Sequence, residues 1–351
     1  METGRQGMSE FNNRRPVSLL DVAKAAGVSR ATASLVLRQS PLVADGTRQR
    51  VIAAMESLGY IYNRGAANLR RKSTGTIGLV LSDIGSPFFS MLMAGVDEVN
   101  DAGSVVTLIA NSVDSPDRQI RQIRHLREHN VDGIILCPAI GSDETLAAEL
   151  VRLDLPYVQA LRYAEWLGAD YVGADYRAGT EKAVRHLVEA GYRRIVFVGA
   201  TALHSAARER NEGFRHAIGL HGLDAGLIVA GAPDNTYDVA AFDRLLKARN
   251  PPDAAVCYND VIALDVMNRL RALGRQPGQD FAVVGMDNLP QAEGAFPALT
   301  TVATHPRDVG RKAAALLQTR IAQSRLAGGE HIIVPPSLIV RQSCGEARVV
   351  A

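Results

Sequence analysis

This chain of 351 residues has few cysteines, and it lacks the long apolar runs of membrane proteins and the signal segment of exported proteins. Its three cysteines, Cys137, Cys257 and Cys344, lie far apart and match no metal-ligand spacing. This pattern argues against a disulfide scaffold or a zinc finger and is typical of a reducing compartment. No run of 18 apolar residues occurs, so we predict no membrane partner. Residues 1–15 are polar and hold no apolar signal core, so we expect a cytoplasmic protein.

Motifs of catalysis are also scarce. Neither a glycine-rich nucleotide fingerprint nor the G-x-S-x-G turn of hydrolases is present, so an α/β enzyme has no sequence support. His125 and His129 match the H-x-x-E-H zinc pattern. They fall on a predicted surface helix, however, where solvated charge is the better interpretation. We therefore expect no enzyme activity, no cofactor and no metal.

Charge is unevenly distributed along the chain. Residues 1–75 carry 12 of the 39 Lys and Arg residues but only 5 of the 37 Asp and Glu residues. The remainder therefore holds 27 basic and 32 acidic residues. A basic segment before a mildly acidic body indicates a module that binds a polyanion, although a solvated basic face would give the same counts.

Three short helices are predicted in the basic segment. Gly27 ends the first, and Ser29 stands where a helix N-cap belongs. Two helices joined by a tight turn form the helix-turn-helix pattern, whose second helix fits the DNA major groove. The predicted helices cover Asp21–Ala26, Arg30–Leu37 and Asp45–Leu58. Their apolar positions at helical spacing, the expected core, are Val22, Ala26, Val28, Ala33, Val36, Leu37, Val51, Ile52, Met55 and Leu58.

The run LDVAKAAGVSRATASLVL at residues 20–37 resembles the DNA-binding signature of the lactose-repressor family. Thr47-Arg48, Leu58-Gly59-Tyr60 and Asn63-Arg64 follow in the family's order. The resemblance implies a helix-turn-helix head at residues 16–60 and a hinge at residues 61–75. The residues that it implies for DNA contact are Leu20, Ser29, Arg30, Ala31, Thr32, Ser34, Leu35 and Arg38 in the head, and Asn63, Arg64, Ala66 and Leu69 in the hinge.

These side chains suit different tasks on DNA. Arg30 is able to bond guanine bidentately, whereas Thr32 and Ser34 suit phosphates. Leu35 departs from the family, which often has arginine there, and offers at most contact with a thymine methyl group. The resemblance implies that Leu69 wedges into the minor groove together with its copy from a second subunit. The hinge is too short for a stable isolated helix, so we expect it to fold on DNA; a flexible basic linker is the alternative.

From residue 76 onward, short apolar runs alternate with amphipathic stretches. This alternation predicts parallel doubly wound sheets, and the length is enough for two lobes with a cleft at the strand ends. The predicted strands are Ile77–Leu81, Val105–Ala110, Gly133–Leu136, Tyr157–Gln159, Ile195–Val198, Ala254–Cys257 and Phe281–Val284. The predicted helices are Phe88–Ala102, Arg118–His129, Thr180–Ala190, Ala207–His221, Tyr237–Ala248 and Ile262–Leu273.

The resemblance continues through this region and covers residues 18–344. The expected fold is a small all-α helix-turn-helix head followed by an α/β periplasmic-binding-protein-like body of two doubly wound parallel-sheet lobes. The body covers residues 76–344. Its lobe 1 is expected at about 76–174 and 304–331, and its lobe 2 at about 175–303 and 332–344.

The resemblance also implies a small-molecule effector in the cleft, bound by Phe88, Phe89, Arg210, Asn259 and Asp287. A guanidinium, an amide and a carboxylate at strand ends suit a sugar, a sugar derivative or another polar metabolite. Three places depart from sugar-binding members of the family. They are Cys137-Pro138, Leu161 and the stretch Gly231-Ala232-Pro233, which lacks an aromatic residue. A purely structural ion pair of Arg210 and Asp287 is the alternative.

The favoured hypothesis is a ligand-responsive transcriptional repressor that binds double-stranded operator DNA as a homodimer. Two identical heads would read the half-sites of a pseudo-palindrome. No heptad tail follows Arg341, so we expect a dimer rather than a tetramer. An exported solute-binding protein and an α/β enzyme are the alternatives, and the basic head and the missing catalytic motifs count against them.

Overall fold

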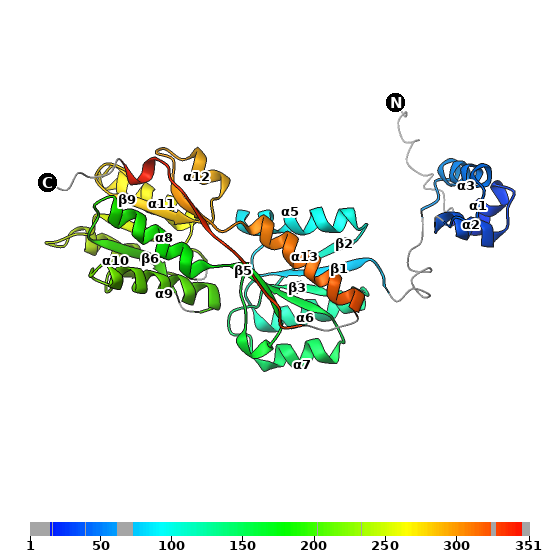
Figure 1. Ribbon diagram of the computed structural model, residues 1–351, viewed down its shortest axis with the longest axis horizontal. Coiled ribbons are helices and arrows are strands. Elements are labelled where there is room, and N and C mark those ends of the chain that lie inside the picture. The colour runs from blue at the N-terminus through cyan, green and yellow to red at the C-terminus, as the bar shows by residue number, and fades with distance from the viewer. Residues whose placement is uncertain are drawn as a thin grey trace, which may run out of the picture. The chain divides into compact units, whose positions relative to one another are not determined.

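The computed structural model describes residues 15, 17–38, 40–61, 73–201, 203–232, 234–323 and 328–345. The chain divides into two compact units. Residues 1–74 contain the head, and residues 75–351 contain the body (Figure 1).

Three helices form the head: α1 (Leu19–Ala25), α2 (Arg30–Leu37) and α3 (Asp45–Leu58). The bounds of α2 and α3 agree with the prediction. Helix α1 begins earlier than predicted because Ser18 caps it, in a capping box with its third residue. Ser29 caps α2 by accepting a hydrogen bond from the backbone of the third residue of the helix, as expected.

The head encloses one small hydrophobic core. The prediction was wrong for Ile52 and Leu58, whose side chains are 43% and 37% exposed. Ala54 is buried in α3 instead, together with Val51 three residues earlier. Because successive residues of a helix are about 100° apart, Ile52 points away from the face that Val51 and Ala54 share. The buried members of the core are Val22, Ala23, Ala26, Ala33, Val36, Val43, Val51 and Ala54.

Each lobe of the body contains a six-stranded sheet. The lobe 1 sheet has the order β11-β5-β4-β3-β1-β2, and the lobe 2 sheet the order β12-β10-β9-β8-β6-β7. Only β12 departs from the predicted parallel arrangement among the described strands, since it pairs antiparallel to β10 at the sheet edge. The strands of lobe 1 are β1 (Thr76–Leu81), β2 (Val106–Asn111), β3 (Ile134–Leu136), β4 (Tyr157–Ala160), β5 (Asp170–Ala174) and β11 (His331–Val334). Those of lobe 2 are β6 (Ile195–Ala200), β7 (Ile228–Ala230), β8 (Ala254–Cys257), β9 (Ala282–Met286), β10 (Thr300–Ala303) and β12 (Ser337–Ile339).

Helices cover both sheets, and buried apolar side chains fill two clusters in each lobe. Burial of the central strands on both sides explains why their sequences are almost continuously apolar. The helices of lobe 1 are α5 (Pro87–Ala102), α6 (Pro116–Glu128), α7 (Glu144–Arg152) and α13 (Pro306–Gln323). Those of lobe 2 are α8 (Tyr176–Glu189), α9 (Ser205–Leu220), α10 (Val239–Leu246), α11 (Asp260–Ala272) and α12 (Pro290–Gly294).

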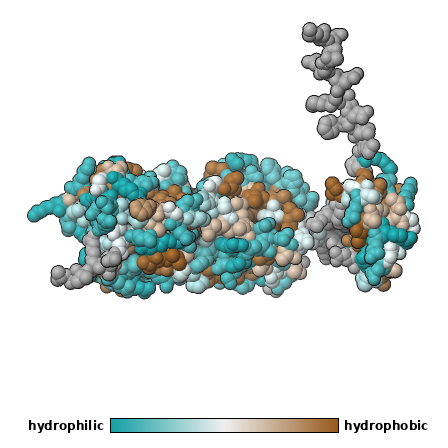
Figure 2. Space-filling model, turned by 90° about the horizontal axis from the view of Figure 1, so that it is seen from above, coloured by the Kyte–Doolittle hydropathy of each residue, from teal (hydrophilic) through white to brown (hydrophobic). Residues whose placement is uncertain are grey.

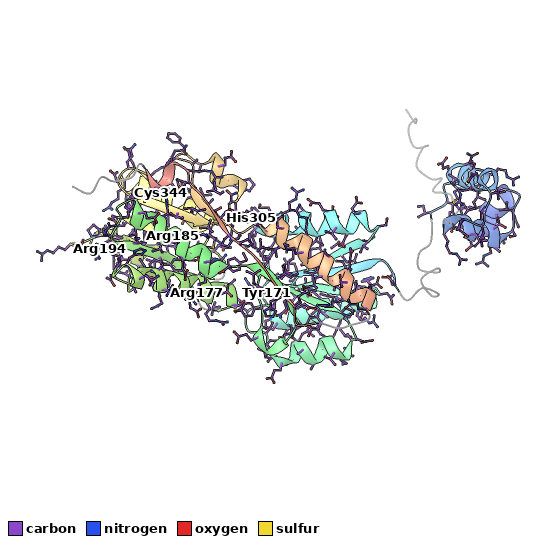
Figure 3. All side chains as sticks on the ribbon, viewed as in Figure 1. Tyr171, Arg177, Arg185, Arg194, His305 and Cys344 are labelled. Atoms are coloured by element: carbon purple, nitrogen blue, oxygen red, sulfur yellow. The ribbon has the colours of Figure 1, made fainter. Side chains whose placement is uncertain are left out.

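The described chain crosses between the lobes after β5, after β10 and after β11 (Figure 1). His305 lies on the second crossing (Figure 3), and its Nε2 is 3.1 Å from the hydroxyl of Ser337, the first residue of β12 after the third crossing. Strand β11 pairs with β5 and carries the lobe 1 sheet to Val334, somewhat beyond the end predicted at about residue 331.

Helices α5 and α13 touch through their backbones. A Cβ atom on Gly95 would lie 1.9 Å from the Arg307 carbonyl oxygen, and one on Gly310 would lie 2.2 Å from the Leu92 carbonyl oxygen. Such distances leave no room for any side chain at either glycine. The two helices therefore pack at a separation that only glycine permits.

A buried carboxylate connects β5 to α13. Asp170 is fully buried and accepts hydrogen bonds from Nε and Nη2 of Arg320, at 2.8 and 2.9 Å. Its oxygens also accept the backbone N–H groups of Gly328 and Glu330. The guanidinium and these N–H groups hold the pKa of Asp170 below its usual range although burial opposes them.

Among the described residues, no helix is both long and apolar enough to cross a membrane.

Replacement of Arg320 should destabilise the body strongly. The Arg320→Met variant keeps the apolar stem but leaves Asp170 buried without its cation, so we expect the free energy of unfolding to fall by about 3 kcal/mol or more. Urea denaturation followed by circular dichroism measures this loss. Arg311→Met is the matched control, since its ion pairs are exposed and should contribute little. Equal stability of the two variants would contradict the role of the buried pair.

Candidate DNA-binding surface and interlobe cavity

The first turn of α2 faces solvent. Arg30 and Ala31 are exposed there. Ser29 accepts a hydrogen bond from the backbone of Thr32 at 3.0 Å, and the two hydroxyl oxygens lie 2.9 Å apart. Leu20, on α1, is 48% exposed. The helix therefore presents a guanidinium and two hydroxyl groups from a rigidly capped end.

Other predicted DNA-contact residues lie further along α2. Arg38 donates hydrogen bonds to the Ser34 hydroxyl and backbone carbonyl, so these two side chains form one polar group. Leu35 packs partly against the head core, and this limits how much of it is available to a base. The predicted hinge residues Asn63, Arg64, Ala66 and Leu69 lie outside the described part of the chain.

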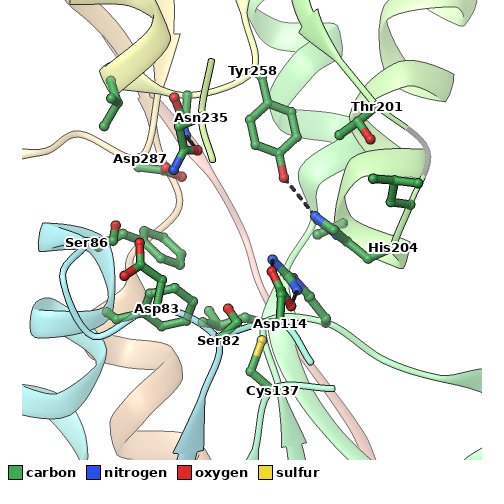
Figure 4. A pocket seen from close by; sticks show the side chains of 18 of the residues that line it. Ser82, Asp83, Ser86, Asp114, Cys137, Thr201, His204, Asn235, Tyr258 and Asp287 are labelled. Atoms are coloured by element: carbon green, nitrogen blue, oxygen red, sulfur yellow. Dashed lines mark hydrogen bonds and ion pairs between the residues drawn. The ribbon is translucent and has the colours of Figure 1, made fainter. Parts of the chain in front are cut away.

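A cavity lies between the lobes at the carboxyl ends of their strands (Figure 4). Side chains of both lobes line it, with Ser82, Asp83 and Ser86 facing Asn235 and Asp287. All five residues predicted for effector contact are among the lining residues: Phe88, Phe89, Arg210, Asn259 and Asp287.

Arg210 is the buried cation of this cavity. Its guanidinium carbon lies 4.0 Å from the ring centre of Tyr176 and 4.5 Å from that of Tyr258. Nη1 donates to the Ala206 carbonyl at 3.0 Å, and Nη2 is 3.6 Å from a carboxylate oxygen of Asp287. Two aromatic faces and one carboxylate thus compensate the desolvation of a side chain that is only 5% exposed.

Asp287 carries the opposite charge from the end of β9. Burial raises the pKa of this carboxyl to about 6, while the Arg210 guanidinium and the Thr304 hydroxyl act to lower it. Thr304 donates its hydroxyl to Oδ1 at 3.2 Å. The backbone of Asp287 has φ of 109°, a region that L-residues rarely adopt. Backbone strain at a cavity wall marks Asp287 as a candidate functional residue.

Asn259 reaches the cavity less directly than predicted. Its Oδ1 caps α11 by accepting the Ile262 N–H at 3.0 Å. Its Nδ2 donates to Oδ1 of Asn235 at 2.6 Å. Asn259 therefore holds Asn235 in place, and Asn235 also lines the cavity.

His204 orients the hydroxyl of Tyr258. The Nδ1 atom of His204 accepts the Ala207 N–H at 3.2 Å, so its proton lies on Nε2. Nε2 is 3.1 Å from the Tyr258 hydroxyl and donates to it (Figure 4). The pKa of His204 falls to about 2 because of its burial and the nearby guanidinium groups of Arg162 and Arg210. The imidazole is therefore neutral, and Tyr258 keeps its own proton to donate.

Lobe 1 contributes a second ion pair to the cavity wall. Arg162, two residues beyond the end of β4, lies 2.5 Å from Asp114, and both side chains are mostly buried. Phe88 and Phe89 at the start of α5 form an apolar wall, with their rings edge to face at 5.6 Å. Among the described residues, no group of three or more His, Cys, Asp and Glu side chains is placed to hold a metal ion.

Sequence reasoning missed several lining residues. Arg162, Tyr176 and Tyr258 each lie one or two residues beyond a strand end, the position where ligand contacts of parallel sheets gather. This position beyond a strand end could have identified them as candidate lining residues. His204 gave no such signal, since it belongs to the turn that precedes α9.

Comparison with known proteins agrees with this organisation. A family model of bacterial regulatory proteins of the lacI family matches residues 18–63, and a periplasmic binding protein-like domain matches residues 184–344. The transcriptional regulator DegA of Bacillus subtilis is 31% identical over 93% of this chain and 97% of its own.

This chain belongs to the LacI family.

Solved structures of LacI-family regulators resemble it over most of its length. A CelR–cellobiose complex is 31% identical, has a TM-score of 0.69, and covers 94% of this chain and 100% of its own. The Lac repressor dimer bound to operator and the anti-inducer ONPF covers the same shares with a TM-score of 0.82 at 24% identity. The expected family and two-lobed fold are confirmed, and the chain is a LacI-family transcriptional regulator.

The carboxyl of Asp287 should titrate near pH 6. Carbon-13 NMR of carboxyl groups, assigned by comparison with Asp287→Asn, measures this pKa. In the Arg210→Met variant the pKa should rise above about 6, because the attraction that favours the charged form is gone. The Arg311→Met variant serves as the control. A value near 4 in the unsubstituted protein would contradict the burial described above.

Proposed function

We propose that this LacI-family regulator is a dimeric repressor whose affinity for a pseudo-palindromic operator depends on a small molecule in the interlobe cavity. One observation carries the proposal. The same chain has a capped, solvent-facing second helix in a helix-turn-helix head and a polar cavity built from two lobes. A solute-binding protein needs only the second of these, and an enzyme needs neither in this form.

The head supplies the DNA readout in this proposal. Arg30 reads a guanine edge in the major groove, because its exposed guanidinium matches the two acceptors of that base. Thr32, Ser34 and Arg38 bond phosphates and fix the register of the helix. Leu69 of the hinge supports the kink at the centre of the operator. This work requires no catalysis and takes place at the chromosome, in the cytoplasm.

The cavity allows a small molecule to control the affinity for the operator in this proposal. Its walls come from both lobes, so a bound molecule that contacts both favours one relative arrangement of the lobes over others. Phe88, Phe89, Arg210, Asn259 and Asp287 are proposed as effector contacts, together with Arg162, Asn235 and Tyr258. Operator and effector must then change each other's affinity by the same factor.

Dimerisation is supported by apolar side chains on the surface of the body. Hydrophobic residues form separate patches among hydrophilic ones on the face drawn in Figure 2. In lobe 2, Phe296 is 91% exposed beside a shallow apolar cavity next to Leu264 and Met267 of α11. In lobe 1, the edge strand β2 exposes Val106 and Ile109. A symmetric dimer would bury such patches against their own copies.

Selection of DNA by the full-length chain tests the regulator function. Random duplex DNA enriched on the chain should give two inverted half-sites, with affinity that falls steeply as salt rises. The Arg30→Ala variant should lose about 1–3 kcal/mol of discrimination at one base pair in each half-site. Fluorescence anisotropy with single base-pair variants of the selected operator measures this loss.

Arg50→Ala is the matched control for that experiment, since Arg50 is an exposed arginine on α3 rather than on α2. It should leave the preference at that base pair unchanged. Enrichment of no sequence, or equal effects of the two variants on base preference, would contradict the proposed readout.

Phe296→Asp should shift the chain toward monomers. A carboxylate placed at a symmetric apolar contact meets its own copy, so association should weaken by at least tenfold. Sedimentation equilibrium of the full chain measures the dimer dissociation constant. Leu220→Asp is the control, because Leu220 is 72% exposed at the end of α9. Unchanged association of Phe296→Asp would exclude this patch from the interface.

A further inference from the structure

The turn that follows β9 has an unusual backbone. Asp287 and Asn288 have φ of 109° and 52°, in the region that favours glycine. Two consecutive non-glycine residues keep such a conformation only where the surrounding contacts impose it. Asp287 and Leu289, at either end of this turn, line the interlobe cavity. The backbone of the turn therefore decides where the Asp287 carboxylate points (Figure 4).

Buried acceptors hold the N–H groups of this turn. Leu289 donates its N–H to Oδ2 of Asp260 at 2.7 Å, and Asn288 donates its N–H to the Thr301 hydroxyl at 3.3 Å. The same hydroxyl donates to Oδ1 of Asp260. Asp260 and Thr301 are fully buried. Loss of either acceptor would leave a buried N–H group without a partner, which is costly.

The place of Asp260 is fixed by two neighbouring elements. Asp260 is the first residue of α11, where the N-terminal end of the helix favours a carboxylate. Gly285 of β9 lies directly against it, because a Cβ atom on Gly285 would be 2.2 Å from Oδ1 of Asp260. Only glycine leaves room for the carboxylate between the helix and the strand. The acceptor of the Leu289 N–H therefore has little freedom to move.

Arg341 holds the turn from the C-terminal segment. Its Nη2 donates to Oδ1 of Asn288 at 2.9 Å, and its Nη1 donates to the Leu299 carbonyl at 2.8 Å. The backbone N–H of Arg341 is itself bonded to the Thr300 hydroxyl at 2.9 Å. One planar guanidinium thus reaches both ends of the segment that leaves the sheet after β9 and returns at β10. A lysine ammonium does not offer this fork of donors.

The left-handed backbone aims the Asp287 side chain. The carboxylate lies 3.6 Å from Nη2 of Arg210 and accepts the Thr304 hydroxyl at 3.2 Å. The direction of a Cα–Cβ bond follows from the backbone angles of its residue. If the contacts of the turn were lost, Asp287 would return to an ordinary backbone conformation, and its carboxylate would leave this place.

From these contacts we propose that Asp260, Thr301 and Arg341 are positioning residues for the effector contact Asp287. They hold the turn in its left-handed conformation and thereby keep the carboxylate in the cavity beside Arg210. They act through the backbone and side chains of the turn, since none of the three is among the lining residues of the cavity. This inference rests on the proposed function of the cavity and extends it to residues behind the cavity wall.

The pKa of the Asp287 carboxyl reports how firmly the turn is held. The groups that face this carboxyl are Arg210 of α9, Tyr176 of α8, Tyr258 after β8 and Asp260 of α11. Burial is the main reason that the pKa of Asp287 is raised to about 6. A loosened turn admits water to the carboxyl, so its pKa should fall toward the ordinary value near 4.

Thr301→Val tests this without a change of charge. The substitution removes one hydroxyl and keeps the shape of the side chain. Carbon-13 NMR of the full-length chain, assigned with Asp287→Asn, should show the pKa of Asp287 falling from about 6 toward 4. Thr180→Val is the matched control, because it removes another fully buried hydroxyl of lobe 2, one that bonds the Tyr176 carbonyl. It should leave this pKa unchanged.

Arg341→Met separates positioning from simple charge. Loss of a nearby cation alone would raise the pKa of Asp287, whereas a loosened turn lowers it, and we expect the lower value. Arg341→Lys keeps the charge but not the fork and should also lower the pKa, so it serves if Arg341→Met does not fold. Arg269→Met is the control, since Arg269 pairs with Asp243 elsewhere in lobe 2.

Hydrogen exchange, followed by mass spectrometry, measures the turn itself. In Asp260→Leu the Leu289 N–H should exchange at least tenfold faster than in the unsubstituted chain. Asp260→Asn keeps an acceptor oxygen and should restore most of the protection. Peptides from the lobe 1 sheet should exchange at the same rate in both variants and serve as the internal reference.

Several outcomes would overturn the proposal. They are an unchanged pKa of Asp287 in Thr301→Val and the Arg341 variants, a higher pKa in Arg341→Met, and unchanged exchange of Leu289 in Asp260→Leu. A lower melting temperature with the pKa and the exchange rate unchanged would also overturn it, because the residues would then only stabilise lobe 2.

These measurements need neither operator nor effector. Success of operator selection with an unchanged pKa would therefore remove only this inference and leave the regulator function standing. Failure of operator selection together with the expected fall in pKa would do the reverse.

Discussion

Burial of one guanidinium, that of Arg210, sets the requirements for the whole interlobe cavity. A buried cation needs compensation, and Tyr176, Tyr258 and Asp287 supply it from three different elements of lobe 2. Each partner is fixed in turn, Tyr258 through His204 and Asp287 through Thr304. The cavity wall is therefore pre-organised before any ligand arrives, so binding has little side-chain entropy to lose.

Compensation of charge recurs on the lobe 1 wall of the cavity and at a contact between the two lobes. Arg162 with Asp114 and Arg208 with Glu165 repeat the pairing of Arg210 with Asp287. Because each of these guanidinium groups already has a carboxylate partner, the proposed effector site would distinguish ligands by hydrogen-bond pattern rather than by attraction to an unpaired cation. Specificity of that kind depends on unmet donors and acceptors, which penalise a ligand that lacks one hydroxyl far more than one that lacks a methylene group.

Local signals explain which features the sequence could predict. Caps and left-handed glycines marked the head helices, and apolar runs marked the central strands, because both signals depend on neighbouring residues. The strands β5, β7, β10, β11 and β12 were missed. All of them except β5 are only three or four residues long, and β5 begins with the charged Asp170. Arg162 and His204 meet across two lobes, and no local pattern reveals such a meeting.

The glycine contact between α5 and α13 gives the body a mechanical connection. Phe88 and Phe89, at the start of α5, touch the cavity, while α13 begins directly after the second crossing at His305. At Gly95 and Gly310 the two helices are in backbone contact, with no side chain between them. We therefore expect α5 and α13 to move together as one rigid unit. A displacement of the aromatic wall should then be passed on to the crossing at His305.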